Sequence, residues 1–305
     1  MSAVAVRAHA KINLDLRILG LRPDGYHELR TVFQSLALHD VLSCEARPGP
    51  FALECSVPGV PLDPTNLAWK AAQVLWRSLR RTGDVRDAVV RIRKHIPMQA
   101  GLGGGSADAA AALVALARLW KADVRPAQLM DLASLIGADV PFFLSGGTAL
   151  GLGRGDEIYP LADLPKHWVV LLTPRFGVST QDAYGWYDGD RAAGTLARPE
   201  PQFVPGPWPS RSAQMVNDLE PPISHRHPEI AEMRAVLLRA GAVAASMSGS
   251  GSTVFGLFQR RTAAATALGA VAGRGWTTML TESLGRGDYA RAARCRLQPS
   301  RVRAV

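Results

Sequence analysis

The chain has 305 residues and a net charge of +9, and with 47% hydrophobic and 20% charged residues it has a globular composition with room for two domains. The N-terminus lacks a basic segment followed by an apolar run, and no apolar run approaches the ~18 residues of a membrane span, so we expect no signal peptide and no membrane partner. The three cysteines lack metal-ligand spacing, which indicates reduced thiols and a cytoplasmic location.

Residues 4–18 alternate between apolar and polar side chains, and this period of two predicts a strand with one buried face. Lys11, Asn13 and Asp15 share the other face. A cation and an amide two residues apart on a rigid strand are a candidate catalytic platform, although a polar strand face is more often simply solvated.

A turn follows at Pro23-Asp24-Gly25, where proline presets φ and glycine accepts a positive φ. Tyr26 and His27 stand at its exit, where their rings could enclose a flat heterocycle or pack against the core. We then expect strands over 30–38 and 41–46, a helix that opens at Leu67 and stops at Gly83, and a strand over 90–96.

The most informative segment is the run Gly101-Leu102-Gly103-Gly104-Gly105-Ser106, which leads into an alanine-rich helix. A loop without side chains that opens a helix presents free N–H groups and the positive end of a dipole, so it predicts an anion site, most often for phosphate. Ser106 is the expected N-cap. The other interpretation is a tight turn that needs glycine only for packing.

Two common phosphate loops are excluded. No lysine follows the glycines, so the P-loop pattern fails. A dinucleotide-binding unit needs a second strand after the helix, whereas Pro126 predicts another helix over 126–136.

Asp139 stands in the segment Gly137-Ala138-Asp139-Val140-Pro141, two residues after a glycine that ends the helix. A partly buried carboxylate near a lysine could act as a general base. Alternatively, Asp139 caps a short helix over 140–144.

The second half of the chain predicts a different layer. A glycine-rich strand and crossover at 146–155 lead to a strand over 167–173, and the prolines of 188–212 indicate a long surface loop. Helices are expected from Met215 and over 229–240 and 262–272, with a strand over 276–281. A second small-residue loop, Ser246 to Ser252, forms a candidate anion nest before a strand. This order suggests a ferredoxin-like α+β layer.

Taken together, these motifs resemble the GHMP kinase superfamily over nearly the whole chain. The resemblance rests on five segments: Ala10-Lys11-Ile12-Asn13-Leu14, the turn 22–27, the glycine loop 101–106, Gly137 to Pro141, and Ser248-Gly249-Ser250-Gly251. It implies a two-domain α+β fold. An N-terminal domain similar to a ribosomal protein domain, residues 1–155 with 282–305, would bind ATP. A ferredoxin-like domain, residues 156–281, would lie on the substrate side.

Within the superfamily, the turn 24–27 and the triple glycine are most similar to kinases that phosphorylate the 2-hydroxyl of a cytidine-diphosphate-linked methylerythritol, a step of the non-mevalonate route to isoprenoid precursors. The resemblance implies that Asp139 takes the proton of the hydroxyl and that Lys11 keeps Asp139 ionised and stabilises the transferring phosphoryl group. It further implies Mg²⁺ on the ATP phosphates, no metal site made by the protein alone, and a monomer or weak homodimer.

The resemblance also implies binding residues. The ATP side comprises Pro97, Gly101, Leu102, Gly103, Gly104, Gly105, Ser106 and Asn66. The substrate side comprises Asn13, Tyr26, His27, Gly177, Val178, Thr180, Gly249, Ser250 and Gly251, with the two rings on the cytosine. The chain departs from the family pattern at two places: Gln99-Ala100 before the loop, and Ala107 in place of a second serine. We expect these departures to change the affinity for the nucleotide more than the activity.

Two other functions stay open at this point. One is another small-molecule GHMP kinase, of the homoserine or mevalonate type, which would not need the aromatic turn. The other is a non-catalytic RNA-binding protein, which the positive charge would suit. RNA binding normally interleaves aromatic residues with basic ones, and the basic runs at 77–94 and after 291 contain none, so we expect no nucleic-acid partner.

Overall fold

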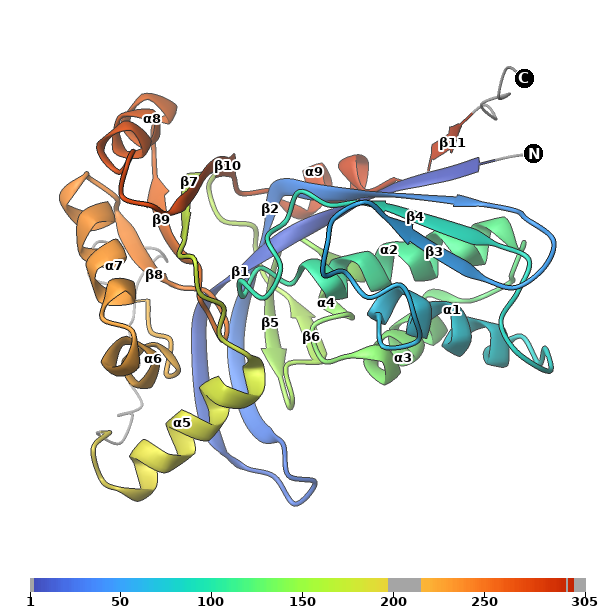
Figure 1. The fold of residues 1–305 in the computed structure, drawn as a ribbon, viewed down its shortest axis with the longest axis horizontal. Helices are drawn as coiled ribbons and strands as arrows, with labels where there is room; N and C mark the ends of the chain where they lie inside the picture. The colour runs from blue at the N-terminus through green and yellow to red at the C-terminus, as the bar shows by residue number, and fades with distance from the viewer. Residues whose placement is uncertain (1–2, 197–214, 295, 299–305) are drawn as a thin grey trace.

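The computed structural model describes residues 3–196, 215–294 and 296–298, which fold around two β-sheets (Figure 1). The larger sheet has seven strands in the order β11-β1-β2-β4-β3, with β5 paired to β2 and β6 paired to β5. All pairs are antiparallel except β3 with β4. Its strands are β1 (Ala3–Leu21), β2 (His27–Glu45), β3 (Ala52–Cys55), β4 (Val89–Arg93), β5 (Thr148–Leu152), β6 (Glu157–Pro160) and β11 (Arg296–Gln298).

Strand β1 carries its apolar residues at alternate positions as predicted, but residues 8–14 are all buried. The apolar residues serve three cores, and Leu16 and Ile18 belong to the one under the helices of the second sheet. Val4, Val6 and Ala8 pack in the helix layer of the larger sheet, whereas Ala10, Ile12 and Leu14 pack against the second sheet. The change coincides with a shift of register between β1 and β2, where His9 pairs with His39 and Lys11 pairs with Ser35. The expectation of two strands over 30–46 was wrong, because β2 is one continuous strand.

Four helices cover one face of the larger sheet: α1 (Leu67–Ser78), α2 (Gly104–Leu119), α3 (Pro126–Ile136) and α4 (Phe142–Ser145). The helix expected over 126–136 is confirmed, and Pro126 is its first residue. The helix expected to stop at Gly83 begins at Leu67 as predicted but already ends at Ser78. The alanines of α2 allow close packing, since Ala107, Ala110 and Leu113 are all buried. After the second sheet the chain returns through α9 (Arg286–Ala292), where the Tyr289 hydroxyl donates a hydrogen bond to the Phe143 carbonyl.

The second sheet has the order β10-β7-β9-β8 and is entirely antiparallel. Its strands are β7 (Trp168–Thr173), β8 (Ala244–Met247), β9 (Val254–Phe258) and β10 (Thr277–Glu282). Its helices are α5 (Thr180–Ala192), α6 (Glu220–Arg226), α7 (Glu229–Arg239) and α8 (Arg261–Ala270). Strand order and connections match the predicted ferredoxin-like layer. The prediction missed β8, whose four residues are uniformly buried and lack any alternation.

Two further expectations need correction. The loop expected over 188–212 begins too early, because α5 continues to Ala192; residues 197–212 lie outside the described part of the chain. The helix expected from Met215 begins at Glu220.

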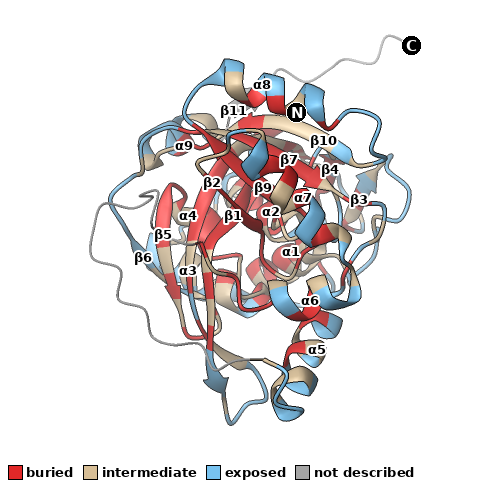
Figure 2. Ribbon diagram, turned by 90° about the vertical axis from the view of Figure 1, so that its left-hand side faces the viewer, coloured by how far each residue is buried: buried red, intermediate tan, exposed pale blue. Residues whose placement is uncertain are grey.

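The two sheets share a buried layer, in which Ile12 and Leu14 of β1 meet Val169, Leu171 and Phe255. Figure 2 shows these central strands buried and the outer faces of α6 and α8 exposed. The hairpin of β5 and β6, residues 148–160, pairs within the larger sheet. We therefore propose the domain boundary between residues 160 and 168, slightly after residue 155. None of the described helices is long and apolar enough to cross a membrane.

Candidate active site

A cavity of about 1060 Å³ opens between the two sheets, and the strands, loops and helices that the sequence singled out converge on it. Of the residues expected to bind ligand or to act in catalysis, all line this cavity except Gly177. Gly177 lies next to Gln99, which does line the cavity, since a Cβ at position 177 would approach Gln99 Oε1 to 3.1 Å.

The glycine loop fits between β1 and the loop 248–251 only without side chains. The amide of Lys11 donates to the Leu102 carbonyl at 3.0 Å, which fixes the loop to β1. A Cβ on Gly101 would lie 2.0 Å from the Ser248 carbonyl oxygen, and a Cβ on Gly103 would lie 2.7 Å from Phe143. Both glycines also have a positive φ, near 70°.

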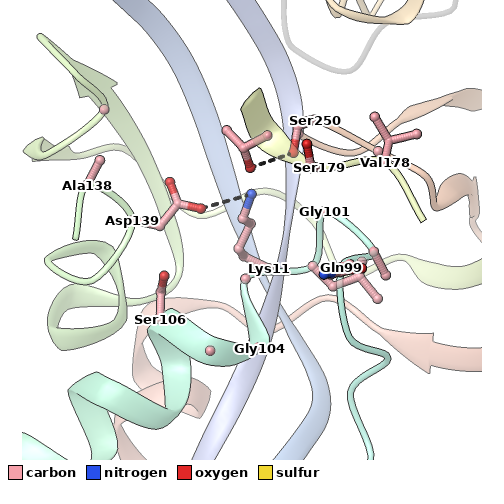
Figure 3. Close-up of a pocket in the computed structure, with 18 of the residues that line it drawn as sticks. Lys11, Gln99, Gly101, Gly104, Ser106, Ala138, Asp139, Val178, Ser179 and Ser250 are labelled. Atoms are coloured by element: carbon pink, nitrogen blue, oxygen red, sulfur yellow. Dashed lines mark hydrogen bonds and ion pairs between the residues drawn. The ribbon is translucent and has the colours of Figure 1, made fainter. Parts of the chain in front are cut away.

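Helix α2 begins at Gly104, and its N-cap is Gly103 in the left-handed conformation, so the expectation of Ser106 as N-cap was wrong. The first backbone bond of the helix runs from Ala107 to the Gly103 carbonyl at 2.8 Å. Within the described residues, no acceptor bonds the amides of Gly104, Gly105 and Ser106. These free donors at a helix N-terminus form an anion site, and the Ser106 side chain stands beside it (Figure 3).

Lys11 and Asp139 meet at the centre of the cavity, with Lys11 Nζ 3.2 Å from Asp139 Oδ2 (Figure 3). The Lys11 side chain is 4% exposed and that of Asp139 is 33% exposed, so a ligand can reach the carboxylate, and Lys11 lines the same cavity although most of its side chain is covered. The N-cap of α4 is Pro141, without a side-chain bond, so the alternative of Asp139 as a helix cap was wrong.

Hydrogen bonds orient the Lys11 ammonium. It donates to Asn13 Oδ1 at 2.6 Å, and Asn13 Nδ2 donates to the Thr31 hydroxyl at 2.7 Å. Thr31 in turn donates to the Asp15 carbonyl at 2.7 Å. The face expected to be solvated is therefore buried, with Asn13 only 3% exposed, because α2 and the loop 248–251 cover it. A cation and a carboxylate in fixed geometry can hold a hydroxyl group and accept its proton.

The loop 248–251 is held partly by its own Ser248 and partly by Asn217, which the sequence did not single out. Ser248 Oγ donates to the Gly101 carbonyl at 2.9 Å and thereby joins the two glycine-containing loops. Asn217 Nδ2 donates to the Met247 and Gly249 carbonyls at 2.9 and 2.8 Å. The Ser250 and Thr180 hydroxyls lie 3.2 Å apart at the cavity wall. No local motif marks Asn217 as a site residue, because the two carbonyls to which its Nδ2 donates are 30 and 32 residues away.

The rings of Tyr26, His27 and Tyr184 line the part of the cavity next to the turn between β1 and β2. The His27 ring stacks on Tyr184 of α5 at 4.7 Å between centroids, with 24° between the planes. Tyr26 is 57% exposed, and the Arg154 guanidinium lies 5.3 Å from its ring. Burial, together with the negative charge of Asp139, raises the pKa of Tyr184, so this phenol stays neutral. Tyr184 was missed because it lies in a helix that the sequence did not reveal.

A buried charge cluster lies behind the glycine loop. Lys94 Nζ donates to Asp40 and to Asp108 Oδ2, the latter at 2.8 Å, and Asp40 also accepts from the amides of His95 and Ile96. Burial raises the pKa of Asp108 above its ordinary range, although Lys94 opposes the shift. The cluster joins β2, the approach to the glycine loop and α2, and so fixes the start of that helix.

Residues 66–147 match the family model of the GHMP kinases N terminal domain, and residues 210–275 match that of the GHMP kinases C terminal. A glycine loop that opens a helix beside a Lys–Asp pair, between two such domains, defines the class of GHMP small-molecule kinases.

The relatives narrow the class. The chain is 46% identical to the 4-diphosphocytidyl-2-C-methyl-D-erythritol kinase of Pelotomaculum thermopropionicum, over 83% of this chain and 88% of the relative. It is 45% identical to the protein of that name from Anaeromyxobacter dehalogenans, over 88% and 84%. A crystal structure of 4-(cytidine 5'-diphospho)-2C-methyl-D-erythritol kinase superimposes with a TM-score of 0.73 at 34% identity, covering 92% of this chain and 99% of that one.

The chain belongs to the 4-diphosphocytidyl-2-C-methyl-D-erythritol kinase family of the GHMP kinases. The homoserine kinase of Cytophaga hutchinsonii shares the fold, with a TM-score of 0.66, but only 17% of the sequence, over 97% of each chain.

Proposed function

We propose that the protein transfers the γ-phosphoryl group of ATP to the 2-hydroxyl of 4-diphosphocytidyl-2-C-methyl-D-erythritol. One observation carries this proposal: a single cavity joins a phosphate-type helix N-terminus, a Lys–Asp pair and a set of aromatic rings. The activities for which its relatives are named agree with this combination.

The residues of the glycine loop fit the phosphates of ATP. The free amides of Gly104, Gly105 and Ser106 would bind phosphate oxygens, and a Cβ at Gly103 would close the space. Pro97 and Leu102 would line the ATP side. Asn66 would support the nucleotide indirectly, because both ends of its side chain already have partners in the protein. Its Oδ1 accepts from the backbone amide of Ala68, and its Nδ2 donates to the Pro61 carbonyl.

The described residues contain no cluster of three or more His, Cys, Asp or Glu that could hold a metal ion, so Mg²⁺ would be carried by the ATP phosphates. When bound there, it would neutralise negative charge on the oxygens that surround the transferred group.

The Lys–Asp pair would perform the proton transfer. Asp139 Oδ2 would accept the proton of the substrate hydroxyl. At the same time the hydroxyl oxygen would bond to the γ-phosphorus of ATP, and the bond between that phosphorus and the oxygen that leaves with ADP would break. Lys11, held by Asn13, would stabilise negative charge on the transferring group. Positioning supplies much of the rate of such reactions, which fits the fixed geometry around Lys11.

The substrate would lie along the second domain. Tyr26 and His27, with Tyr184, would enclose the cytosine, since flat rings stack well on a planar base. Val178, Thr180 and the loop 249–251 line the cavity between these rings and Asp139, where the diphosphate and the erythritol would lie. Gly177 would support Gln99, next to which it lies.

Some features of the proposal concern the whole molecule. Residues 1–155 with 282–305 would form the nucleotide domain, extended to residue 160 by the hairpin of β5 and β6, and the rest the substrate domain. We propose a monomer or weak homodimer that acts in the cytoplasm on a small molecule, without a nucleic-acid partner.

The test is release of ADP with Mg·ATP and each of four alcohols: the cytidylated methylerythritol, free 2-C-methylerythritol, homoserine and mevalonate. We expect turnover only with the cytidylated compound. Turnover of homoserine or mevalonate would replace the proposal by another GHMP kinase activity. If folded protein turns over none of them and binds RNA with a steep salt dependence, the non-catalytic alternative holds.

A further inference from the structure

His27 is tied to helix α5 by a bond that none of the roles above uses. Its Nε2 lies 2.8 Å from Oδ1 of Asp188, one turn of α5 after Tyr184. The His27 side chain is 11% exposed, whereas Asp188 is 54% exposed at the rim of the cavity. The bond therefore joins the start of β2, in the first domain, to a helix of the second.

This bond determines where the imidazole hydrogen resides. An ionised carboxylate only accepts hydrogen bonds, so Nε2 must be the donor. In the neutral ring the hydrogen is then on Nε2, and Nδ1 keeps a free lone pair. The surroundings leave Nδ1 to a ligand: Tyr184 covers one face of the ring, Tyr187 meets it edge-on at 6.3 Å, and no described residue bonds Nδ1.

We propose that Asp188 is a positioning residue that holds His27 in its Nε2–H tautomer, so that the cavity presents a hydrogen-bond acceptor to the base. Cytosine offers an amino group at C4, which can donate to this lone pair. Uracil has a carbonyl oxygen there, which would face it with no hydrogen between. Asp188 thus selects cytosine over uracil. This inference rests on the proposed function, since it assumes a pyrimidine beside His27.

The chemistry of base selection supports the assignment. Stacking of rings holds any pyrimidine, because both bases have a π-face. A polar group of fixed direction is what distinguishes two bases of the same shape, because the wrong base leaves a desolvated group unpaired. A histidine free to exchange tautomers could serve either base, and the carboxylate removes that freedom.

The first experiment compares kcat/KM for the cytidine-linked substrate with that for its uridine-linked analogue in wild type, Asp188→Ala and Asp188→Asn. We expect Asp188→Ala to lower the cytidine preference about tenfold, mainly through the two KM values, with the KM of ATP unchanged. Asp188→Asn should lower the preference by an intermediate amount, because its side chain can either accept from Nε2 or donate to it and therefore favours neither tautomer strongly. The matched control is Asp190→Ala on the same helix, whose side chain pairs with Arg226 instead.

An unchanged preference in folded Asp188→Ala would overturn the proposal, and so would an Asn variant with the full preference of wild type, since the acceptor-only carboxylate would then not be needed. If the wild type does not phosphorylate the cytidine-linked compound at all, the proposed function itself fails.

A second measurement separates these failures, because it needs no substrate. The ¹⁵N chemical shifts of the His27 ring in the free protein, recorded where the ring is neutral, should show hydrogen on Nε2 in wild type and a mixture of tautomers in Asp188→Ala. Hydrogen on Nδ1 of the neutral wild-type ring would contradict the proposal.

Discussion

Asp139→Asn isolates the proton transfer from the binding of ATP. The amide keeps the size and position of the carboxylate but has no basic oxygen to take a proton. Loss of a general base lowers turnover by about two to four orders of magnitude, which corresponds to about 3–5 kcal/mol of transition-state free energy. We expect kcat to fall by at least about two orders of magnitude, while the dissociation constant of ATP changes little.

The structure also bounds the cost to folding. Lys11 keeps its hydrogen bond to Asn13 Oδ1 at 2.6 Å, so the ammonium is not left alone. In the variant the side-chain amide oxygen at position 139 can still accept from Lys11 Nζ, so the loss should be limited to about 1 kcal/mol. The free energy of unfolding should therefore be nearly that of wild type, and any large loss of turnover must arise in the chemical step.

The assay couples ADP release to a spectrophotometric signal at saturating ATP and substrate, with ATP binding measured separately by calorimetry. Asp131→Asn, an exposed carboxylate on α3, is the matched control and should behave as wild type. Turnover of Asp139→Asn within a few-fold of wild type would refute the role of Asp139 as base.

Three further changes test other parts of the account. Gly101→Ala should destabilise the fold by about 1–3 kcal/mol, because its Cβ would lie 2.0 Å from the Ser248 carbonyl oxygen. The control is Gly189→Ala, since position 189 has open space around it. Equal melting temperatures of the two variants would contradict the argument. Tyr26→Ala should raise the KM of the substrate roughly tenfold and leave that of ATP unchanged, the cost of a lost ring contact of about 1.4 kcal/mol; equal effects on both would exclude the aromatic enclosure. Burial lowers the pKa of His9 from 6.5 to about 4. As the pH falls, the imidazole is therefore protonated in the unfolded chain before it is protonated in the folded one. The free energy of unfolding should fall by up to about 3 kcal/mol between pH 6.5 and pH 4. Urea unfolding at several pH values measures this loss, and a slope no flatter in His9→Gln would argue against it.

The sequence predicted those site features that a local pattern encodes. The glycines of the loop stand together because the loop itself needs them, and Lys11 and Asn13 are revealed by the alternation of β1. The burial of Lys11 could not be predicted from the residues around it, because the segments that cover it, 101–108 and 248–251, are far away in the sequence.

The missed residues have a common cause. Asn217, Tyr184 and Asp188 act through partners far away in the sequence, and no spacing marks such contacts. The misassigned N-cap had a different origin: serine is a favoured cap, but a glycine with positive φ closed the turn three residues earlier.

Identification of the product tests the central claim most directly. The protein is incubated with Mg·ATP and the cytidylated methylerythritol, and the mixture is followed by ³¹P NMR. The account predicts a new phosphomonoester resonance in an amount equal to the ADP formed, on a compound whose diphosphate link is intact. Because the tertiary carbon bears no hydrogen, this resonance should lack the three-bond coupling to a proton that a phosphate on another hydroxyl would show. ADP with inorganic phosphate alone, or a phosphate on another hydroxyl, would contradict it.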